Sequence, residues 1–384
     1  MTDYVARAEA LVPRIGAAAD EIERERRLPG HLLAALHDAG FFRLLLPRSL
    51  GGAEIDPLTF ARVVKTVAMA DGSTAWCLCQ NTVCSIVAAW LPVESARAIF
   101  AAPDAVLAWG PGPARAAATQ GGYRVTGHWS FASGCRHATW LGAHCPVFDA
   151  DGRQRLGAAG APIELTVLFP VGAAPMTDIW QVVGLRGTAS DAYAVEDLFV
   201  PEAFTLIRDI PETRREAGPL YAMSTHLLFA AGFASVALGL ARGLLDALLA
   251  LASEKTPRGY RTRLAESALA QAEIATAEAR WRGAHMYLMG TLAETWGHVE
   301  RTNRFDPDQR MALRLAATHT ILEAVAVADA AYHAAGATAI FARNPFERRL
   351  RDIHTVAQQV QARRAHYENV GRHLLGFATD SQFV

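Results

Sequence analysis

Two short segments of the chain combine small and polar residues within apolar surroundings. In GHWSFASGCRHATW, residues 127–140, an alternating run reaches Phe131 and gives way to Ala132, Ser133 and Gly134. In WQVVGLRGTASDAY, residues 180–193, the small or hydroxyl-bearing residues are Gly184, Gly187, Thr188 and Ser190. A loop of this composition exposes backbone and hydroxyl groups, and can approach a planar ligand closely. The same composition is also typical of ordinary β-hairpin ends.

The sequence lacks the motifs of several other classes of enzyme. The chain contains no Walker A loop, no G-x-G-x-x-G, no H-E-x-x-H and no G-x-S-x-G motif, so a Rossmann-type dinucleotide enzyme is disfavoured. His128, His137 and His144 occur in one block, but their spacing does not indicate that they converge. We therefore expect no metal site. The five cysteines form no disulfide or zinc pattern, and we expect reduced, buried thiols.

Composition narrows the class of protein further. The 384 residues include 51% hydrophobic and 20% charged residues, which is enough apolar material for two or three packed units. The formal net charge of −1 disfavours a nucleic-acid partner recruited by global charge. The N-terminal segment lacks a signal-like apolar core, and the longest apolar run, residues 227–241, is shorter than the ~20 residues of a membrane span. We expect a cytoplasmic protein without a membrane partner.

The elements that position these segments change in character along the chain. Residues 1–104 are predicted to form a helical domain, in which Asp56 and Pro57 mark a helix start. Residues 105–210 are predicted to form a β domain, where Tyr123, Val125, Gly127, Trp129 and Phe131 alternate with polar residues on one half-buried strand. Further strands are expected at 163–169 and 193–200.

The last part of the chain, residues 211–384, is predicted to form a four-helix bundle. Apolar residues recur at helical spacing over 220–252, 264–292 and 307–334, and Pro345 is expected to open a fourth long helix that reaches residue 376. In the first of these helices, Gly239 and Gly243 could let another helix approach closely.

Several motifs together resemble the acyl-CoA dehydrogenase superfamily. They are PRSLGGAEIDPLTF at 47–60, DGSTAW at 71–76, GLRGTASDAYAVEDLFVP at 184–201 and PFERRLRD at 345–352. The resemblance covers nearly the whole chain. It implies an α+β, mostly α fold with an N-terminal helical domain, a middle antiparallel β-barrel or sandwich, and a C-terminal four-helix bundle.

The dehydrogenases of this superfamily typically use a glutamate to remove the α-proton of an acyl-CoA. In many of them it lies about eight residues beyond the aspartate of the C-terminal motif, where this chain has Ala357, Gln358, Gln359 and Val360. A neutral amide cannot act as that base. Glutamates on other helices, Glu254, Glu266 and Glu273, remain open. An acyl-CoA dehydrogenase or related flavin oxidase is thus the alternative function, and a non-catalytic flavin-fold protein is a third.

The segments 127–140 and 351–376 instead resemble the two-component flavin monooxygenase branch. That resemblance implies FADH2 or FMNH2, with FAD favoured, supplied by a separate flavin reductase. It also implies O2 as co-substrate, a C4a-hydroperoxyflavin, and hydroxylation of a small aromatic molecule. Members are commonly homotetramers packed through the C-terminal bundle.

The resemblance also implies roles for individual residues. Ser133 matches the position that hydrogen-bonds the flavin N5/O4 edge, with Phe131 and Ala132 packing on the ring. Arg186, Thr188 and Ser190 belong to the loop that borders the flavin, while Arg263 and Gln271 are expected to reach the flavin tail of a neighbouring subunit. Catalytic roles are expected for Ser133 and for His354 and Gln359, on the helix that closes the pocket.

The expected substrate pocket departs from the branch pattern. Its predicted residues are Asn81, Cys84, Trp109 and His137, and either Asn81 or Cys84 stands where several members have a histidine. Gln359 replaces a second frequent histidine. An indole is electron-rich at carbon and needs less help from a base than a phenol. We therefore consider an indole-type or other fused aromatic substrate, and a phenolic substrate remains open.

Overall fold

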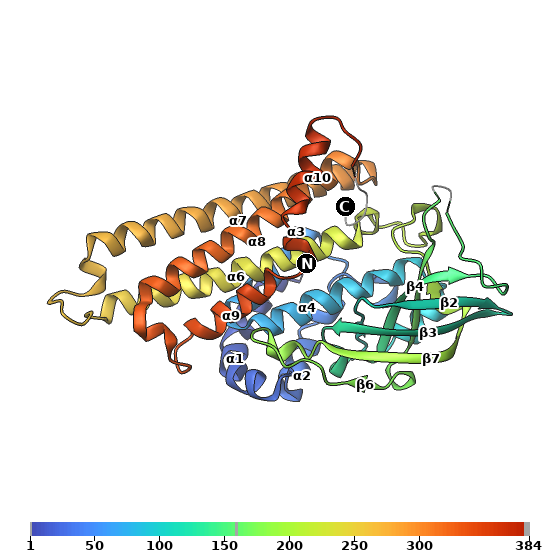
Figure 1. Cartoon of the computed structure of the whole chain (residues 1–384), viewed down its shortest axis with the longest axis horizontal. Helices are drawn as coiled ribbons and strands as arrows, with labels where there is room; N and C mark the ends of the chain where they lie inside the picture. The colour runs from blue at the N-terminus through green and yellow to red at the C-terminus, as the bar shows by residue number, and fades with distance from the viewer. Residues whose placement is uncertain (1, 158–159, 380–384) are drawn as a thin grey trace.

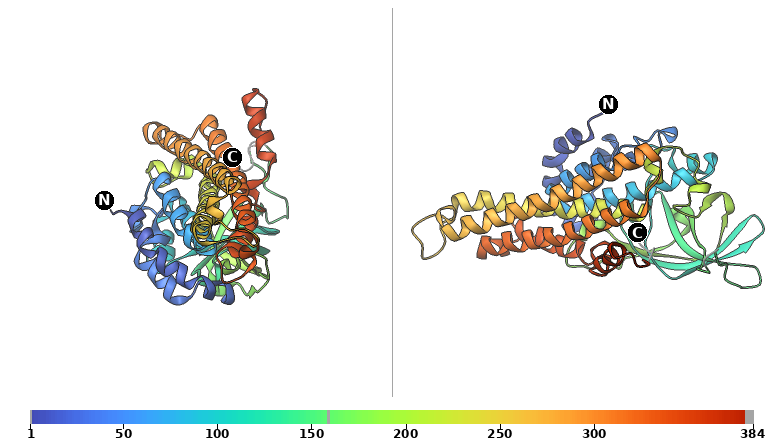
Figure 2. Two further views of the ribbon diagram at one scale, coloured as in Figure 1. Left: turned by 90° about the vertical axis from the view of Figure 1, so that its left-hand side faces the viewer. Right: turned by 90° about the horizontal axis from the view of Figure 1, so that it is seen from above.

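A computed structural model describes residues 2–157 and 160–379 of the chain. The molecule is elongated, with a twisted sheet at one end and long helices that extend away from it (Figure 1). Seen from above, the N-terminal helices lie beside these long helices (Figure 2). The order of helices, sheet and helical bundle agrees with the expected fold class.

Five helices form the N-terminal part: α1 (Tyr4–Glu25), α2 (Gly30–Asp38), α3 (Pro57–Ala70), α4 (Gly72–Ser85) and α5 (Val93–Phe100). The predicted helix start at Asp56 is confirmed, because its carboxylate accepts a hydrogen bond of 2.8 Å from the Thr59 backbone N–H. Asp71 caps α4 in the same way, through the N–H of Thr74 at 2.7 Å. Every residue of α4 is buried, so this helix forms the centre of the fold.

The middle part is one eight-stranded sheet, with strand order β6-β7-β3-β2-β4-β5-β8 and β1 paired to β4. Its strands are β1 (Leu107–Ala108), β2 (Ala114–Thr119), β3 (Gly122–Ala132), β4 (Trp140–Phe148), β5 (Glu164–Pro170), β6 (Met176–Thr177), β7 (Asp191–Pro201) and β8 (Thr205–Leu206). The expectation of a purely antiparallel block is wrong in one respect. β4 pairs in parallel with both β1 and β2, because β3 reverses the direction of β2 and β4 reverses it again.

Strand β3 follows the predicted alternation only as far as Trp129. Val125 and Trp129 are fully buried, but Phe131 is 60% exposed and has a φ of +58°. The register against β7 shifts between Trp129 and Ala132, which is a β-bulge. The bulge turns Phe131 out of the face that the alternation assigned to it.

Three long helices form the bundle: α6 (Thr225–Glu254), α7 (Ala268–Thr302) and α8 (Pro307–Ala335). The predicted close approach on the first of them is confirmed. A Cβ added at Gly239 would collide with the backbone carbonyl of Lys65 and with Ala68 on α3. Glycine at this position therefore lets α3 and α6 pack with their backbones close together.

The expectation of a fourth long helix is wrong. The segment after Pro345 forms α9 (Phe346–Val356), a short 3-10 turn (Val360–Ala362) and a separate helix α10 (Ala365–Leu374). At the break, the Gln359 side chain accepts a hydrogen bond of 2.8 Å from the Gln361 N–H, and the Gln361 side chain accepts one from Arg314 of α8. These side-chain bonds compete with the helical ladder, and the 3.6-residue pattern does not reveal them.

Two helices, Thr225–Glu254 and Pro307–Ile340, are long and apolar enough to cross a membrane by length and composition alone. The uninterrupted apolar run in the sequence is shorter because scattered polar residues interrupt both helices. The most apolar stretch of the first is 94% buried, and that of the second is 61% buried. This burial is that of helices in a protein core.

Candidate active site

The end of strand β3 presents an exposed aromatic ring beside a buried hydroxyl. Phe131 lies edge-on to Trp180, with 5.8 Å between the ring centroids. Two residues later Ser133 is only 5% exposed, and Gly134 has a φ of +78°. Because Phe131 adopts a left-handed backbone conformation that costs free energy for a non-glycine residue, the exposed ring points to function.

The Ser133 hydroxyl is held from two sides. The indole Nε1 of Trp76, on α4, donates a hydrogen bond of 2.9 Å to Ser133 Oγ. The Ser190 hydroxyl lies 2.7 Å away on the other side. Trp76 is in turn stacked on Phe233 of α6, with 3.9 Å between the ring centroids. Helix α4, the bundle and the sheet thus all meet at this serine.

The loop of residues 184–190 brings two more hydroxyls to Ser133. Thr188 Oγ1 lies 2.7 Å from Ser190 Oγ, and Thr188 also donates a hydrogen bond of 2.9 Å to the backbone carbonyl of Leu185. The loop bends through Leu185 and Ala189, whose φ values are +51° and +46°. The structure therefore brings together three of the predicted site residues, which are Ser133, Thr188 and Ser190.

Helix α9 fixes this loop from outside the sheet. The carboxylate of Asp352 accepts a hydrogen bond of 2.6 Å from the Leu185 N–H. A Cβ at Gly184 would collide with the backbone carbonyl of Arg351, so glycine permits the close contact between loop and helix. Burial raises the pKa of Asp352 to about 7, and the nearby carboxylate of Asp71 adds to the shift.

Arg186 points away from the hydroxyls that its loop carries. Its guanidinium bonds Glu23 of α1 at 3.4 Å. Its Nε has no hydrogen-bond partner among residues 2–157 and 160–379. The predicted contact of Arg186 with a flavin stays a prediction.

The four predicted pocket residues gather beside α4 and bond to one another or to backbone. His137 Nε2 lies 3.0 Å from Asn81 Oδ1, and the Asn81 amide donates to the Ser133 carbonyl at 3.3 Å. The Gln80 amide nitrogen lies 3.5 Å from Cys84 Sγ and 3.4 Å from the Trp109 carbonyl. All four are mainly held within this cluster, and their contact with a substrate stays a prediction.

Burial shifts the pKa values of His137 and Cys84, the two titratable residues of this cluster, away from the range that acid–base catalysis needs. It lowers the pKa of His137 to about 3, so the imidazole is neutral at pH 7. It raises the pKa of the Cys84 thiol well above its usual value, which keeps the sulfur protonated. Neither side chain is suited to act as a base on a substrate.

His354 and Gln359 lie on the outer side of α9 and beyond its end. His354 Nε2 bonds Asp329 of α8 at 2.8 Å, and the His354 side chain is 47% exposed. Gln359 Nε2 is buried without a hydrogen-bond partner in the described part of the chain. No hydrogen bond among the described residues joins either side chain to Ser133. Their catalytic roles stay predictions.

Arg263 and Gln271 lie at the far end of the bundle, where α6 connects to α7 (Figure 1). Arg263 donates to the Ser253 carbonyl at 3.2 Å, and Gln271 donates to the Ala265 carbonyl at 2.8 Å. This end is remote from the sheet of the same chain. A flavin tail could meet these residues only on a second copy, which agrees with the expectation without testing it.

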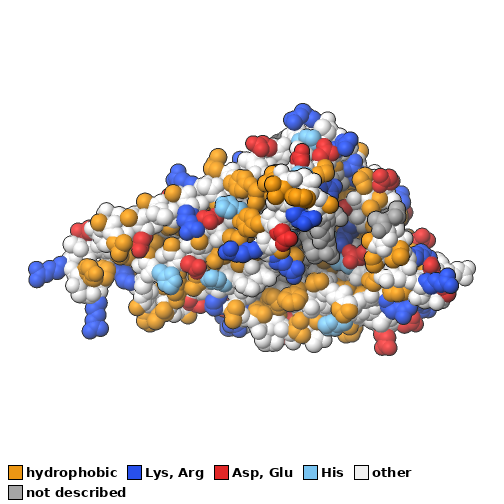
Figure 3. Space-filling model, turned by 45° about the horizontal axis from the view of Figure 1, so that its top comes forward, with side chains coloured by type: hydrophobic (Ala, Val, Ile, Leu, Met, Phe, Trp, Pro, Cys, Tyr) orange, Lys and Arg blue, Asp and Glu red, His pale blue; other side chains and the backbone are white. Residues whose placement is uncertain are grey.

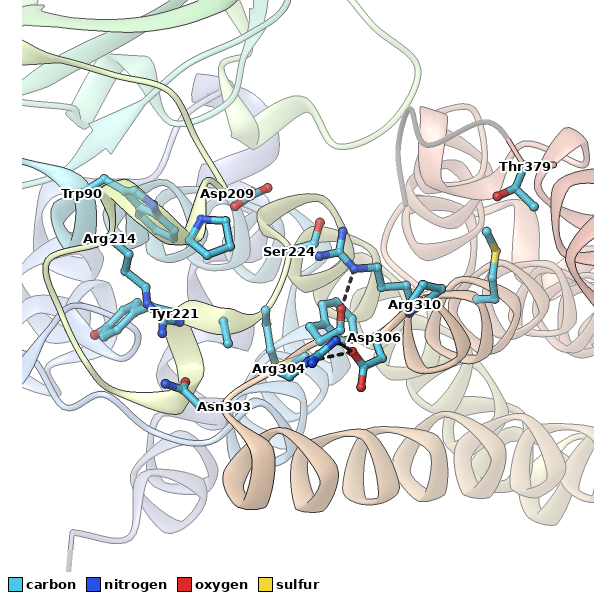
Figure 4. A pocket seen from close by; sticks show the side chains of 16 residues that line it. Trp90, Asp209, Arg214, Tyr221, Ser224, Asn303, Arg304, Asp306, Arg310 and Thr379 are labelled. Atoms are coloured by element: carbon cyan, nitrogen blue, oxygen red, sulfur yellow. Dashed lines mark hydrogen bonds and ion pairs between the residues drawn. The ribbon is translucent and has the colours of Figure 1, made fainter. Parts of the chain in front are cut away.

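A separate cavity of about 470 Å³ lies between the end of α4 and the α7–α8 turn (Figure 4). Trp90 and Tyr221 line one side, and Arg304 forms an ion pair with Asp306 on the other. None of its lining residues belongs to the hydroxyl group around Ser133. The cavity is therefore not the space in which Ser133 could meet a ligand.

Three residues at the site were not assigned roles from the sequence: Trp76, Trp180 and Asp352. Two of them lie inside motifs, since Trp76 ends DGSTAW and Asp352 ends PFERRLRD. Trp180 opens the second small and polar segment. The motifs marked these positions, but the contacts to residues 57 and 167 positions away could only be found in three dimensions.

Comparison with known proteins agrees with this geometry. The family "Acyl-CoA dehydrogenase, N-terminal domain" matches residues 7–91, and "Acyl-CoA dehydrogenase, C-terminal domain" matches residues 231–364. The chain is 30% identical over 364 residues to the indole-3-acetate monooxygenase of Pseudomonas putida, covering 93% of this chain and 89% of that protein. It is also 30% identical over 358 residues to the oxygenase subunit HsaA, a flavin-dependent monooxygenase of Rhodococcus jostii, covering 91% of each.

A solved structure extends the agreement to the arrangement of the fold. XiaF from Streptomyces sp., in complex with FADH2 and glycerol, superposes with a TM-score of 0.90 at 25% identity, covering 98% of this chain and 95% of XiaF. The matches span the helical, sheet and bundle parts together. The chain belongs to the acyl-CoA dehydrogenase superfamily, in its branch of flavin-dependent monooxygenase oxygenase components.

Proposed function

We propose that this protein takes reduced flavin, FADH2 in preference to FMNH2, from a separate reductase and uses O2 to hydroxylate a small aromatic molecule in the cytoplasm. The observation that carries the proposal is the pairing of exposed Phe131 with the bonded hydroxyl of Ser133. A flat aromatic ring system fits beside Phe131 and Trp180, and its polar edge fits Ser133. When bound, reduced flavin supplies the electrons that activate O2.

The protein's own residues would exclude water and hold the ligands. Trp76, Phe229 and Phe233 form an aromatic row, with Phe229 and Phe233 stacked at 5.7 Å between centroids. Trp109 meets this row edge-on at 6.3 Å from Phe229. A site walled by aromatic rings limits the access of water to a reactive oxygen species.

Neither His137 nor Cys84 is suited to act as a base on a phenol, which favours an indole-type substrate. His137 is neutral and bonded to Asn81, and Gln359 is an amide. An electron-rich ring carbon can attack an activated oxygen without prior removal of a proton, whereas a phenol gains from such removal. The relative that acts on indole-3-acetate supports the same substrate class.

The alternative of acyl-CoA dehydrogenation has little support from the placement of carboxylates. Residues 357–360 form the break after α9 and carry no acid. Glu254, Glu266 and Glu273 are exposed at the α6–α7 end of the bundle, remote from Ser133 of the same chain. The relatives described above are monooxygenases.

A homotetramer is part of the proposal, and exposed apolar side chains on the bundle support it. Figure 3 shows hydrophobic side chains interspersed with charged ones along this part of the surface. Large hydrophobic side chains that are more than half exposed in this part of the chain are Tyr260, Leu269, Met286, Ile340, Leu374, Leu375 and Phe377. Exposed apolar groups of this kind are typical of a surface that a second copy covers.

The proposal is tested by anaerobic stopped-flow spectroscopy with one equivalent of FADH2 or FMNH2, mixed with oxygenated buffer with and without indoles and phenols. We expect a flavin species that precedes oxidised flavin, and one atom of 18O from 18O2 in the aromatic product. Reoxidation that forms no product with any aromatic, together with turnover of an acyl-CoA, would refute it.

A further inference from the structure

Three hydroxyl groups form a continuous row that ends at a backbone carbonyl. Ser133 Oγ and Ser190 Oγ are 2.7 Å apart, Ser190 Oγ and Thr188 Oγ1 are 2.7 Å apart, and Thr188 Oγ1 lies 2.9 Å from the Leu185 oxygen. Ser133 is 5% exposed, and Thr188 and Ser190 are 1% exposed. Bulk water therefore cannot replace any of these bonds.

Counting hydrogens fixes the direction of the whole row. A carbonyl oxygen only accepts, so Thr188 donates its single hydrogen to Leu185. Ser190 must then donate to Thr188, and Ser133 must donate to Ser190. Three bonds use three hydrogens, and any other assignment gives up a buried hydrogen bond.

The other side of Ser133 is fixed by a donor that cannot reverse. Indole Nε1–H only donates, so Trp76 occupies one lone pair of Ser133 Oγ. The hydroxyl hydrogen is committed to Ser190. What remains on Ser133 is one lone pair, so the residue can accept one further hydrogen bond and has no hydrogen to donate.

We infer that the row from Leu185 to Ser133 makes the protein select flavin by its redox state, because it presents a hydrogen-bond acceptor alone to flavin N5. Reduced flavin carries an N–H at N5 and can donate to Ser133. Because oxidised flavin has only a lone pair at N5, Ser133 would have no hydrogen to offer to that atom. The inference rests on the proposed function and on the expected contact of Ser133 with N5.

Thr188 and Ser190 are positioning residues in this scheme, since they act through the Ser133 hydroxyl. The selection suits an enzyme that receives its flavin already reduced from a partner. Ser133 would accept a hydrogen bond from flavin that is bound in its reduced form and would make no such bond with the oxidised form. Asp352 supports the row because it holds the Leu185 N–H at 2.6 Å, and the Leu185 carbonyl is the row's terminal acceptor.

The test compares equilibrium affinities for FADH2, measured anaerobically, and for FAD, by flavin fluorescence, in wild type, Ser190→Ala and Thr188→Val. Either substitution frees the Ser133 hydrogen to turn toward N5. We expect FAD to bind about fivefold more tightly in both variants while FADH2 changes little, a factor typical of one hydrogen bond. Neither substitution should shift affinity once Ser133→Ala is present, because both act through Ser133.

Matched controls separate this effect from a general loss of packing. Thr188→Ser keeps the hydroxyl and should keep the wild-type preference. Ser85→Ala removes another buried hydroxyl, bonded to the Thr82 carbonyl at 2.7 Å on the same helix as Trp76, and should leave both affinities unchanged. In 5-deaza-FAD a carbon replaces N5, so its oxidised and reduced forms should be bound alike by wild type and both variants.

The outcomes separate the inference from the proposed function. If wild type prefers FADH2 but Ser190→Ala and Thr188→Val keep the full preference, the hydroxyl row does not set it and the inference is wrong, while the oxygenase proposal stands. Equal wild-type affinities for FAD and FADH2 would also overturn the inference. Failure of wild type to bind either flavin would remove the proposed function itself.

Discussion

The sheet end and the far end of the bundle differ in how completely one chain builds them. At the sheet end, Ser133, Thr188 and Ser190 are buried, and their hydroxyls bond within the same chain. At the bundle end, the side chains of Arg263 and Gln271 are exposed and donate to the backbone carbonyls of Ser253 and Ala265. In the proposed site, the part around Ser133 is therefore preorganised within each chain, whereas the part expected to hold the flavin tail would be completed by a second copy.

The largest expected effect comes from the preorganised end. Ser133→Ala should raise the yield of hydrogen peroxide relative to hydroxylated product about tenfold or more, because the acceptor at the flavin edge is lost. Product and peroxide are measured per FADH2 consumed. Ser85→Ala is the matched control and should leave the ratio unchanged. An unaltered ratio in Ser133→Ala would remove the serine from the reactive part of the site.

At the bundle end, a substitution should affect the binding of FADH2 more than the binding of the shorter FMNH2. Arg263→Ala should weaken FADH2 binding about tenfold and leave FMNH2 binding nearly unchanged, since FMN lacks the adenosine phosphate that a guanidinium could hold. Anaerobic titration gives both affinities. Light scattering on the same samples checks that the expected tetramer is intact, because a dissociated protein would lose the contact for another reason. Equal losses for both flavins would contradict the assigned role.

A smaller effect concerns the carboxylate that ties the 184–190 loop to α9. Because the pKa of Asp352 is raised to about 7, the folded state holds this proton more tightly than the unfolded chain. The free energy of unfolding should therefore fall as the pH rises from about 4 to 7. Asp71, Glu23, Arg348, Arg349 and Arg351 also face this region.

Asp352→Asn should flatten the pH dependence of stability in that window and keep an acceptor for the Leu185 N–H. Urea unfolding of both proteins at several pH values between 4 and 8 measures the difference. Parallel pH curves for the two proteins would show that Asp352 is not the group that titrates.

The smallest effect on stability is expected at His354. Its pair with Asp329 is half exposed on both sides, so His354→Ala should change the free energy of unfolding by less than about 1 kcal/mol. The predicted catalytic role requires product formation to fall more than affinity for reduced flavin. Equal changes in the two would assign His354 to the surface of the bundle.

The sequence predicted the elements that have a periodic apolar pattern and the segments that contain a recognisable motif. Helical spacing located α6, α7 and α8, and the small and polar segments contain the three hydroxyls that the structure brings together. It did not predict the bulge at Phe131, because the break in alternation depends on pairing with β7. The sequence pattern also predicted one helix in place of α9 and α10, because the spacing of apolar residues does not reveal the side-chain hydrogen bonds of Gln359 and Gln361.

The sequence also did not predict contacts between distant positions, because a local pattern contains no information about pairing with another segment. The bond from Trp76 to Ser133 and the bond from Leu185 to Asp352 join segments that are far apart in the sequence. The local sequence pattern predicts which face of a helix or strand is buried. It does not predict which residue of another segment contacts that face, and the direction of the hydroxyl row depends on those contacts.

In the proposed site, the outward-turned Phe131 also links the stability of the folded chain to the supply of flavin. Phe131 is 60% exposed on a strained strand end, and in the proposed site a bound flavin would cover this ring. A ligand that binds only the folded state stabilises it by an amount that grows with the ratio of ligand concentration to Kd. Cells with abundant reductase should therefore accumulate more of the oxygenase, through slower turnover of the chain rather than faster synthesis.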